Sequence, residues 1–310
     1  MACEKNEDDF VATINEKDSS LTDFLSDHIR NHESLDSLEI ALDLSGMMST
    51  FQSPGTYTLF APNNEAFVNM MAGDSTINQI ADIDLIKLSN IIKYHSLPNH
   101  KNSFDINLNS YFPTLNSIGS SNEANIIEFD KPMPTKIILN NGAEMVEIDM
   151  FALNGILHII DSIIEPQNMF QMCENDERYS SMLEAINIFG DTISDLLKES
   201  GDHTLFAPSN DAFQDLLNSN SSWNSIADIN RDTLKVLLSY HLTDTRNIQT
   251  RQMTQDQKII SIAGDTITVD LSRGFQLITQ DTSQNKVNIE AMDIQGINGV
   301  IQSVDKVMKP

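Results

Sequence analysis

The sequence predicts an α+β protein that is built from two copies of one domain. The segment TLFAPNNEAF at residues 58–67 returns as TLFAPSNDAF at residues 204–213, which lies 146 residues further along the chain. A repeat of this length is too long for a solenoid unit, so it indicates the duplication of a whole domain. Helix-like spacing fills the first half of each copy and strand-like runs fill the second half, an order that is typical of the α+β class.

Two further matches extend the repeat over most of the chain. The pair Tyr94-His95 returns as Tyr240-His241 with the same offset, whereas Asn154-Gly155 returns as Asn298-Gly299 only 144 residues later. The second copy has therefore lost two residues net, and we expect this loss in loops between Tyr240 and Asn298.

These offsets set the expected domain bounds. We predict a flexible N-terminal tail at residues 1–17, a first domain at 18–168 and a second domain at 169–310. The join between the two copies is expected around residues 167–174, directly after Pro166.

Charge and composition limit the possible partners. The formal net charge of −26 repels phosphate backbones and anionic lipid surfaces, so we expect no nucleic-acid binding. The hydrophobic fraction of 40% is ordinary for a globular protein. Two cysteines, Cys3 and Cys173, provide no disulfide framework.

The repeated TLFAP segment predicts a corner between a strand and a helix. Residues 58–61 have strand character, and Pro62 cannot donate a ladder hydrogen bond, so the strand is expected to end there. Asn63, or Ser209 in the second copy, is a favourable N-cap for the helix that follows. The repetition of this segment is therefore explained by folding alone.

The Tyr-His pair is expected at the end of a helix that runs from Ile83 to His95. Leu85, Leu88 and His95 fall at helical spacing on one apolar face, and His241 lies in the same way in the second copy. We interpret both histidines as buried and neutral. The alternative is a catalytic histidine, which is disfavoured because neither has evident partners for a triad.

Strand signals dominate the second half of each copy. Asn154-Gly155 predicts a hairpin, and the apolar run at residues 156–160 predicts a buried strand after it. Further strands are expected within residues 136–148 and 259–271, on both sides of glycine-containing turns. Gln302 replaces His158 in the second copy, which argues against a shared catalytic role for that histidine.

Motifs of known chemistry are absent from the sequence. It contains no glycine-rich phosphate loop, no Gly-x-Ser-x-Gly elbow and no His-Glu-x-x-His helix. His28 and His32 have the spacing of two metal ligands on a helix, but no third ligand is evident, and a solvated helix face is the favoured interpretation. We expect no enzyme activity, no cofactor and no metal.

Taken in order, the TLFAP segment, the Tyr-His pair and the Asn-Gly ending resemble the fasciclin domain, twice, from about Ser19 to Pro310. The resemblance implies a β-sandwich or wedge flanked by helices. It also implies a role in cell adhesion, matrix contact or carbohydrate-associated surface binding. The Tyr-His region has been treated as an adhesion motif in this family, which would assign that role to Tyr94, His95, Tyr240 and His241.

The first residues, MACEKNEDD, resemble the processed end of a bacterial surface lipoprotein, in which Cys3 would carry the lipid. Contact with a membrane is then expected only through this N-terminal anchor, at the outer membrane and cell surface. A secreted or periplasmic protein and a cytosolic protein with an incidental cysteine are the alternatives. Mass spectrometry of the native N-terminus is expected to find a diacyl or triacyl group on Cys3, and an unmodified Cys3 would contradict the anchor.

The leading functional hypothesis is a non-catalytic, cell-surface adhesion or ligand-binding protein with an extracellular protein or glycan as its ligand. The alternative is an accessory lipoprotein of an outer-membrane complex for polysaccharide binding and uptake, with another outer-membrane protein as its partner. An enzyme is the third hypothesis, and it requires a cleft with convergent titratable groups.

Overall fold

The computed structural model describes residues 22–107, 110–117, 123–133, 136–140, 142–244, 246–281 and 286–309. The chain divides into two compact units: unit 1 comprises Met1–Leu108 and Lys131–Ile164, and unit 2 comprises Asn109–Asp130 and Glu165–Pro310. This division sets the boundary after Ile164 and assigns residues 109–130 to unit 2. The sequence-based bounds of 18–168 and 169–310 stay a prediction.

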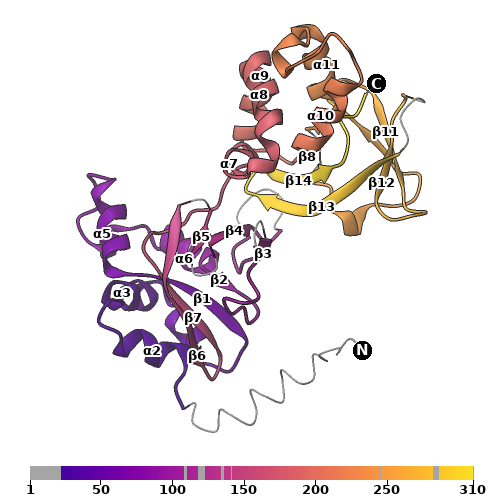
Figure 1. Ribbon diagram of the computed structural model, residues 1–310. Helices are drawn as coiled ribbons and strands as arrows, with labels where there is room; N and C mark the ends of the chain where they lie inside the picture. Colours follow the sequence, from indigo (N-terminus) through magenta and orange to yellow (C-terminus); the bar gives the residue numbers. More distant parts are fainter. Residues whose placement is uncertain are drawn as a thin grey trace. The chain divides into compact units, whose positions relative to one another are not determined.

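In the first repeat, helices precede most strands along the chain (Figure 1). The helices are α2 (Leu25–Asn31), α3 (Asp36–Ser45), α4 (Met48–Phe51), α5 (Asn64–Ala72), the short 3-10 helix η1 (Ile80–Asp82) and α6 (Leu85–Tyr94). The strands are β1 (Tyr57–Pro62), β2 (Ser96–Leu97), β3 (Ser110–Pro113), β4 (Ile126–Met133), β5 (Lys136–Leu139), β6 (Ala143–Ala152) and β7 (Gly155–Ile160).

The second repeat follows the same order. Its helices are α7 (Met169–Asn175), η2 (Glu177–Tyr179), α8 (Ser180–Phe189), α9 (Asp191–Lys198), α10 (Asn210–Asn218), η3 (Ile226–Asp228), α11 (Arg231–Tyr240) and η4 (Thr250–Gln252). Its strands are β8 (His203–Pro208), β9 (Leu242–Thr243), β10 (Lys258–Ile260), β11 (Thr266–Asp270), β12 (Gln276–Ile278), β13 (Val287–Gly296) and β14 (Gly299–Val304).

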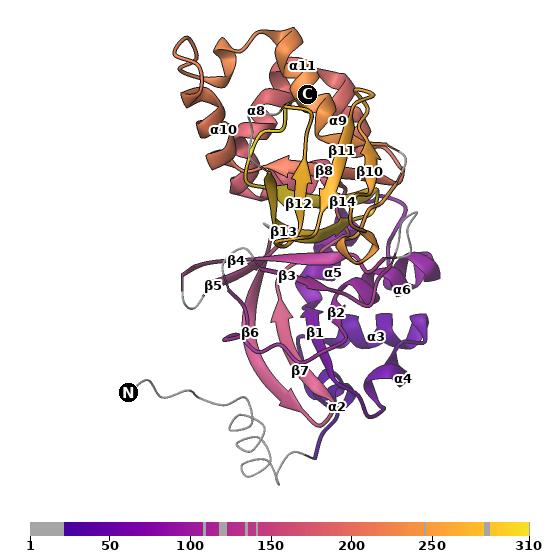
Figure 2. The same ribbon diagram turned by 90° about the vertical axis from the view of Figure 1, so that its right-hand side faces the viewer.

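Each repeat forms a mixed sheet with helices packed on one side. The strand orders are β2-β1-β7-β6-β5-β4-β3 and β10-β11-β12-β13-β14-β8-β9. Figure 2 shows α3, α4 and α6 on one side of β1 and β7, and it shows α8, α10 and α11 together on one side of β8 and β14. The predicted α+β class is confirmed, and each repeat has a sheet of barrel-like or wedge-like form that is flanked by helices.

The first strand of each repeat pairs in parallel with its last strand. Tyr57 of β1 lies opposite Gly155 of β7, and His203 of β8 lies opposite Gly299 of β14. All six residues of β7 and all six of β14 are buried, so both faces of each of these strands are covered. The centre of each repeat is therefore a buried pair of parallel strands.

The predicted corner between strand and helix is confirmed in both units. Strand β1 ends at Pro62, and Asn63 Oδ1 accepts a hydrogen bond of 2.8 Å from the Ala66 N–H at the start of α5. In unit 2, Ser209 Oγ accepts the Ala212 N–H in the same way, at 3.3 Å. The repeated segment thus supplies an N-cap for each of these helices.

Two expectations need correction. Helix α6 begins at Leu85 and not at Ile83, because the Asp84 carboxylate caps it, and Leu85 is 54% exposed and so does not belong to the apolar face. The segment around residues 167–174, where the join is expected, contains most of helix α7, and the position of the join stays a prediction. The hairpin at Asn154-Gly155 exists, but its two-residue loop is Leu153 and Asn154, since Gly155 already pairs with Ala152.

Gly155 is needed for close packing and not for the turn itself. A Cβ atom at this position would lie 2.5 Å from the Tyr57 carbonyl oxygen of the neighbouring parallel strand and 2.5 Å from Leu25 of α2. Only glycine allows this approach. The glycine of the repeated Asn-Gly pair therefore serves the contact between β7, β1 and α2.

Candidate functional site

The four residues of the Tyr-His pairs lie in the interior of their units. Tyr94 and Tyr240 are 0% exposed, and His95 and His241 are 1% exposed. Each tyrosine ends its helix, α6 or α11, and each histidine is the C-cap. The expectation that both histidines are buried is confirmed.

His95 joins the end of α6 to the segment that follows β7. The Ile164 N–H donates to His95 Nε2 at 3.1 Å, so Nε2 must be the unprotonated nitrogen. Nδ1–H then donates to the Ile91 carbonyl oxygen at 2.7 Å. Both nitrogens of a neutral imidazole are therefore satisfied, and burial lowers the pKa of His95 to about 4.

His241 repeats this arrangement in unit 2. Its Nδ1–H donates to the Leu237 carbonyl oxygen at 2.7 Å, and its Nε2 accepts the Met308 N–H at 2.8 Å. Burial again lowers the pKa to about 4. Each histidine thus fastens the last segment of its unit to the preceding helix, which is a structural role that leaves no ring nitrogen available to a substrate.

The tyrosine hydroxyls also make internal contacts. Tyr94 Oη accepts a hydrogen bond of 2.8 Å from Asn140 Nδ2, beyond the end of β5. Tyr240 Oη–H donates to the Thr266 carbonyl oxygen of β11 at 3.3 Å. The Tyr-His pair therefore links a helix end to two separate parts of its unit.

His158 and Gln302 fill equivalent buried positions in β7 and β14. His158 Nδ1 accepts the Asp149 N–H at 3.1 Å, and Nε2–H donates to the Lys101 carbonyl oxygen at 2.9 Å. Gln302 Oε1 accepts the Asp293 N–H at 3.0 Å, and its Nε2 donates to the Ile248 carbonyl oxygen at 3.0 Å. The amide thus reproduces both hydrogen bonds of the imidazole, which explains why the two repeats exchange these residues.

This equivalence gives a direct mutational prediction. We expect His158→Gln to change the free energy of unfolding by less than about 1 kcal/mol, because glutamine can satisfy the same two backbone groups. His158→Leu is expected to cost about 2–4 kcal/mol, since it leaves a buried N–H and a buried carbonyl without partners. Urea denaturation of the two variants checks this, and equal losses would contradict it.

Two further pairs of repeated residues, Asn154 with Asn298 and Asp149 with Asp293, make structural contacts that no local sequence pattern indicates. Asn154 Oδ1 accepts the Leu25 N–H at 2.9 Å, and its Nδ2 donates to the carbonyls of Phe51 and Ser53, at 2.9 Å each. Asp149 adopts φ of 60° at a bulge in β6, and its carboxylate accepts hydrogen bonds from the Ser103 N–H and hydroxyl. Their counterparts Asn298 and Asp293 make matching contacts, so agreement between the repeats was the signal available in the sequence.

The spacing of His28 and His32 does not lead to a metal site among the described residues. His28 lies on α2 with Nε2 3.0 Å from the Phe151 carbonyl oxygen, whereas Nδ1 of His32 is 2.9 Å from Ser34 Oγ. Within the described ranges, no three His, Cys, Asp or Glu side chains gather as metal ligands.

The predicted lipid attachment site lies outside the described residues. Cys3 belongs to residues 1–21, so its modification stays a prediction. None of the helices in the described part of the chain has the length and apolar content that crossing a bilayer requires.

Comparison with known proteins identifies the family. The model of the Fasciclin domain matches residues 33–166 and 177–310. The chain belongs to the fasciclin-domain family. The fold agrees with this fasciclin assignment: a solved FAS1 domain pair from the insect cell adhesion molecule Fasciclin I has a TM-score of 0.53 and 18% identity, with 88% of this chain and 97% of that chain covered.

Other fasciclin-domain relatives include longer animal proteins and a cyanobacterial one. Transforming growth factor-beta-induced protein ig-h3 of Sus scrofa is 27% identical over 268 residues, and human periostin is 26% identical over 282 residues. The matches cover 84% and 86% of this chain but only 35% and 30% of those proteins, so the chain spans about a third of their length. Protein sll1483 of Synechocystis is 26% identical over 140 residues, which cover 45% of this chain and 72% of that protein.

Proposed function

We propose that this fasciclin-domain protein is a non-catalytic adhesion or ligand-binding protein of the cell surface. One observation carries the proposal: polar residues that the two repeats share at the described corners and strand ends are engaged in internal hydrogen bonds. His95, Asn154 and Asp149 hold helices and strands together, and none of them meets a second reactive group in an open cleft. We therefore propose that ligands bind to surface residues, which are the residues that differ between the two domains.

The relatives support an adhesion role. The solved domain pair comes from a protein described as a cell adhesion molecule. Human Stabilin-1 is a further relative, at 29% identity over 135 residues. An extracellular protein or a glycan is the proposed ligand, and the net charge of −26 disfavours nucleic acids and anionic lipids.

The Tyr-His pairs enter this proposal as indirect contributors. Because Tyr94, His95, Tyr240 and His241 are buried, we propose that they support a binding surface by fixing the ends of α6 and α11. Tyr94→Phe removes the hydroxyl group that accepts the Asn140 hydrogen bond and keeps the ring, so it is a suitable probe of this role. If Tyr94→Phe lowers the free energy of ligand binding by more than it lowers the free energy of unfolding, a direct contact between Tyr94 and the ligand is favoured instead.

A binding screen tests the proposed function. The full chain is immobilised and exposed to panels of extracellular matrix proteins and of glycans, and retention is measured at two salt concentrations. An unrelated protein of similar net charge serves as the control, because charge alone can retain basic partners. We expect retention of at least one ligand that the control does not retain, and the same retention on both surfaces would contradict the proposal.

A further inference from the structure

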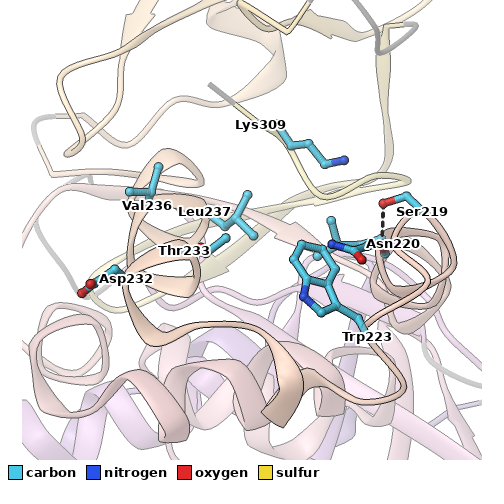
Figure 3. A pocket seen from close by; sticks show the side chains of 9 residues that line it. Ser219, Asn220, Trp223, Asp232, Thr233, Val236, Leu237 and Lys309 are labelled. Carbon is cyan, nitrogen blue, oxygen red and sulfur yellow. Dashed lines mark hydrogen bonds between the residues drawn. The ribbon is translucent and has the colours of Figure 1, made fainter.

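Unit 2 contains an open pocket of about 620 Å³ between α10 and α11. The end of α10 and the loop after it form one wall, α11 forms the opposite wall, and Lys309 extends over the pocket from the segment after β14 (Figure 3). The volume lies within the range of small-molecule sites. The pocket lining does not include the residues that both repeats use for internal hydrogen bonds, such as His241, Asp293 and Asn298.

Trp223, the single tryptophan of the chain, forms one wall of this pocket. Its backbone is fixed by a turn, in which the Trp223 N–H donates to the Asn220 carbonyl oxygen at 3.0 Å and Asn220 Oδ1 accepts the Ser222 N–H at 3.0 Å. The indole is half-buried and packs against the core of unit 2. A rigid aromatic surface is therefore presented to the pocket before any ligand arrives.

Polar groups surround this aromatic surface. Thr233 comes from the first turn of α11 and Lys309 lies above the pocket, whereas Asp232 stands at the outer edge with its carboxylate turned away from the indole (Figure 3). Within the described ranges, neither the Asp232 carboxylate nor the Lys309 ammonium group forms an ion pair. Leu216 and Leu237 supply the apolar part of the lining. The pocket thus combines one aromatic face with hydrogen-bond donors and acceptors around it.

The first repeat has the same turn but lacks this chemistry. The Ile77 N–H donates to the Asp74 carbonyl oxygen at 3.0 Å, and the Thr76 N–H donates to Asp74 Oδ1 at 3.0 Å. Ile77 therefore occupies the position of Trp223 on an equivalent backbone. By the repeat offsets, Ile86 corresponds to Asp232, and Glu165 corresponds to Lys309. The scaffold is shared, and the aromatic and charged groups are particular to unit 2.

We propose that this pocket binds a pyranose ring of a glycan. The C–H groups on one face of a pyranose pack against the electron-rich face of an indole, while its hydroxyl groups need donors and acceptors at the rim. A purely apolar ligand would desolvate Asp232 and Lys309 without replacing their contacts with water. The inference rests on the proposed binding function and names the ligand class of one site.

An adjoining pocket gives room for a second sugar. It has a volume of about 300 Å³ and shares Leu216, Ser219 and Lys309 with the first pocket. Lys306 and Asp215 also line it, so two lysines and one carboxylate border the adjoining space in a chain of strongly negative charge. We therefore assign the site to at least a disaccharide, and Lys309 is placed to contact a carboxylate if the second sugar is a uronic acid.

Titration of the full chain with defined disaccharides tests the proposal. The probes are cellobiose and diacetylchitobiose as neutral sugars and digalacturonate as an acidic one. Because Trp223 is the only tryptophan, a bound sugar is expected to change the tryptophan emission in a saturable manner. Calorimetry measures the affinity of variants that lack the fluorophore.

The Trp223, Asp232 and Lys309 variants copy the first repeat, so that each position receives the residue that the other repeat carries there. Trp223→Ile is expected to lower the affinity by about tenfold or more, in line with the loss of an aromatic stacking contact. Asp232→Ile is expected to lower it as well and serves if Trp223→Ile does not fold. Lys309→Glu should weaken only the binding of digalacturonate. Ile86→Ala, at the exposed counterpart of Asp232, is the matched control and should change nothing.

Two results would overturn the inference. One is the absence of any saturable change in emission or heat with all three sugars, and the other is unchanged affinity in both Trp223→Ile and Asp232→Ile. If the chain still retains a matrix protein in the binding screen while no sugar binds, the inference fails and the proposed adhesion function stands.

Discussion

Lowering the pH from about 6.5 to about 4 is expected to destabilise unit 2 by about 3 kcal/mol through His241 alone. Burial lowers the pKa of His241 from 6.5 to about 4 in the folded state. Each unit of pKa shift corresponds to about 1.4 kcal/mol, which gives this magnitude. Protonation of His95 is expected to destabilise unit 1 to a similar extent, because the pKa of His95 is lowered to the same value.

The sign follows from the protons bound in each state. Between the two pKa values the unfolded chain protonates the histidine and the folded chain does not, so the unfolded state binds more protons. The free energy of unfolding therefore falls as the pH decreases through this window. Above about pH 6.5 both states are neutral at this residue, and the contribution no longer changes.

Tryptophan emission measures this effect for unit 2, since Trp223 is the only tryptophan. Urea denaturation is followed at a series of pH values for the natural chain and for His241→Gln. The variant keeps every carboxylate of the natural chain. A difference between the two proteins in how the free energy of unfolding depends on pH therefore reports the contribution of His241. We expect His241→Gln to be less stable than the natural chain at pH 7. Its free energy of unfolding should, however, change less between pH 6.5 and pH 4. Parallel pH profiles of the two proteins would contradict the assignment.

Replacing Asn298 with alanine is expected to cost about 3–5 kcal/mol. Its side chain accepts the Met169 N–H at 2.9 Å and donates to the carbonyls of Leu197 and Glu199, at 2.8 and 2.9 Å. The alanine variant leaves these backbone groups buried and unsatisfied. It also releases the ends of α7 and α9 from the loop before β14.

The matched control is Asn224→Ala, which changes an exposed asparagine of the same unit. Only the backbone N–H of Asn224 is engaged there, as the donor to Asp228 Oδ2 at 2.8 Å. Urea midpoints from tryptophan emission are compared for the two variants. We expect a clear decrease for Asn298→Ala and a change within about 0.5 kcal/mol for Asn224→Ala. A decrease of similar size in both would contradict the role of Asn298.

The sequence predicted those parts of the fold that depend on local patterns and on the repeat itself. The corner at Pro62 and Asn63 follows from strand and N-cap preferences, and the structure has it in both units. The burial of His95 followed from its spacing on an apolar helix face, and this was confirmed. Duplication made each of these predictions testable twice within one chain.

Contacts between distant segments could not be predicted in this way. Asn154 was interpreted as a turn residue, but its side chain bonds to Leu25, which lies 129 residues away in the sequence. Asp149 depends on a bulge whose register no local pattern indicates. No sequence pattern marks Trp223, because a single aromatic residue in a loop has no periodicity, and only the fold places Asp232 and Lys309 in the same pocket.

The parallel pairing of β1 with β7, and of β8 with β14, determines when each repeat can fold during synthesis. Strand β1 must wait for β7, which leaves the ribosome roughly a hundred residues later, before its hydrogen bonds on that side are made. In the interval the emerging chain exposes an unpaired strand edge and apolar helix faces, which are the features that molecular chaperones recognise.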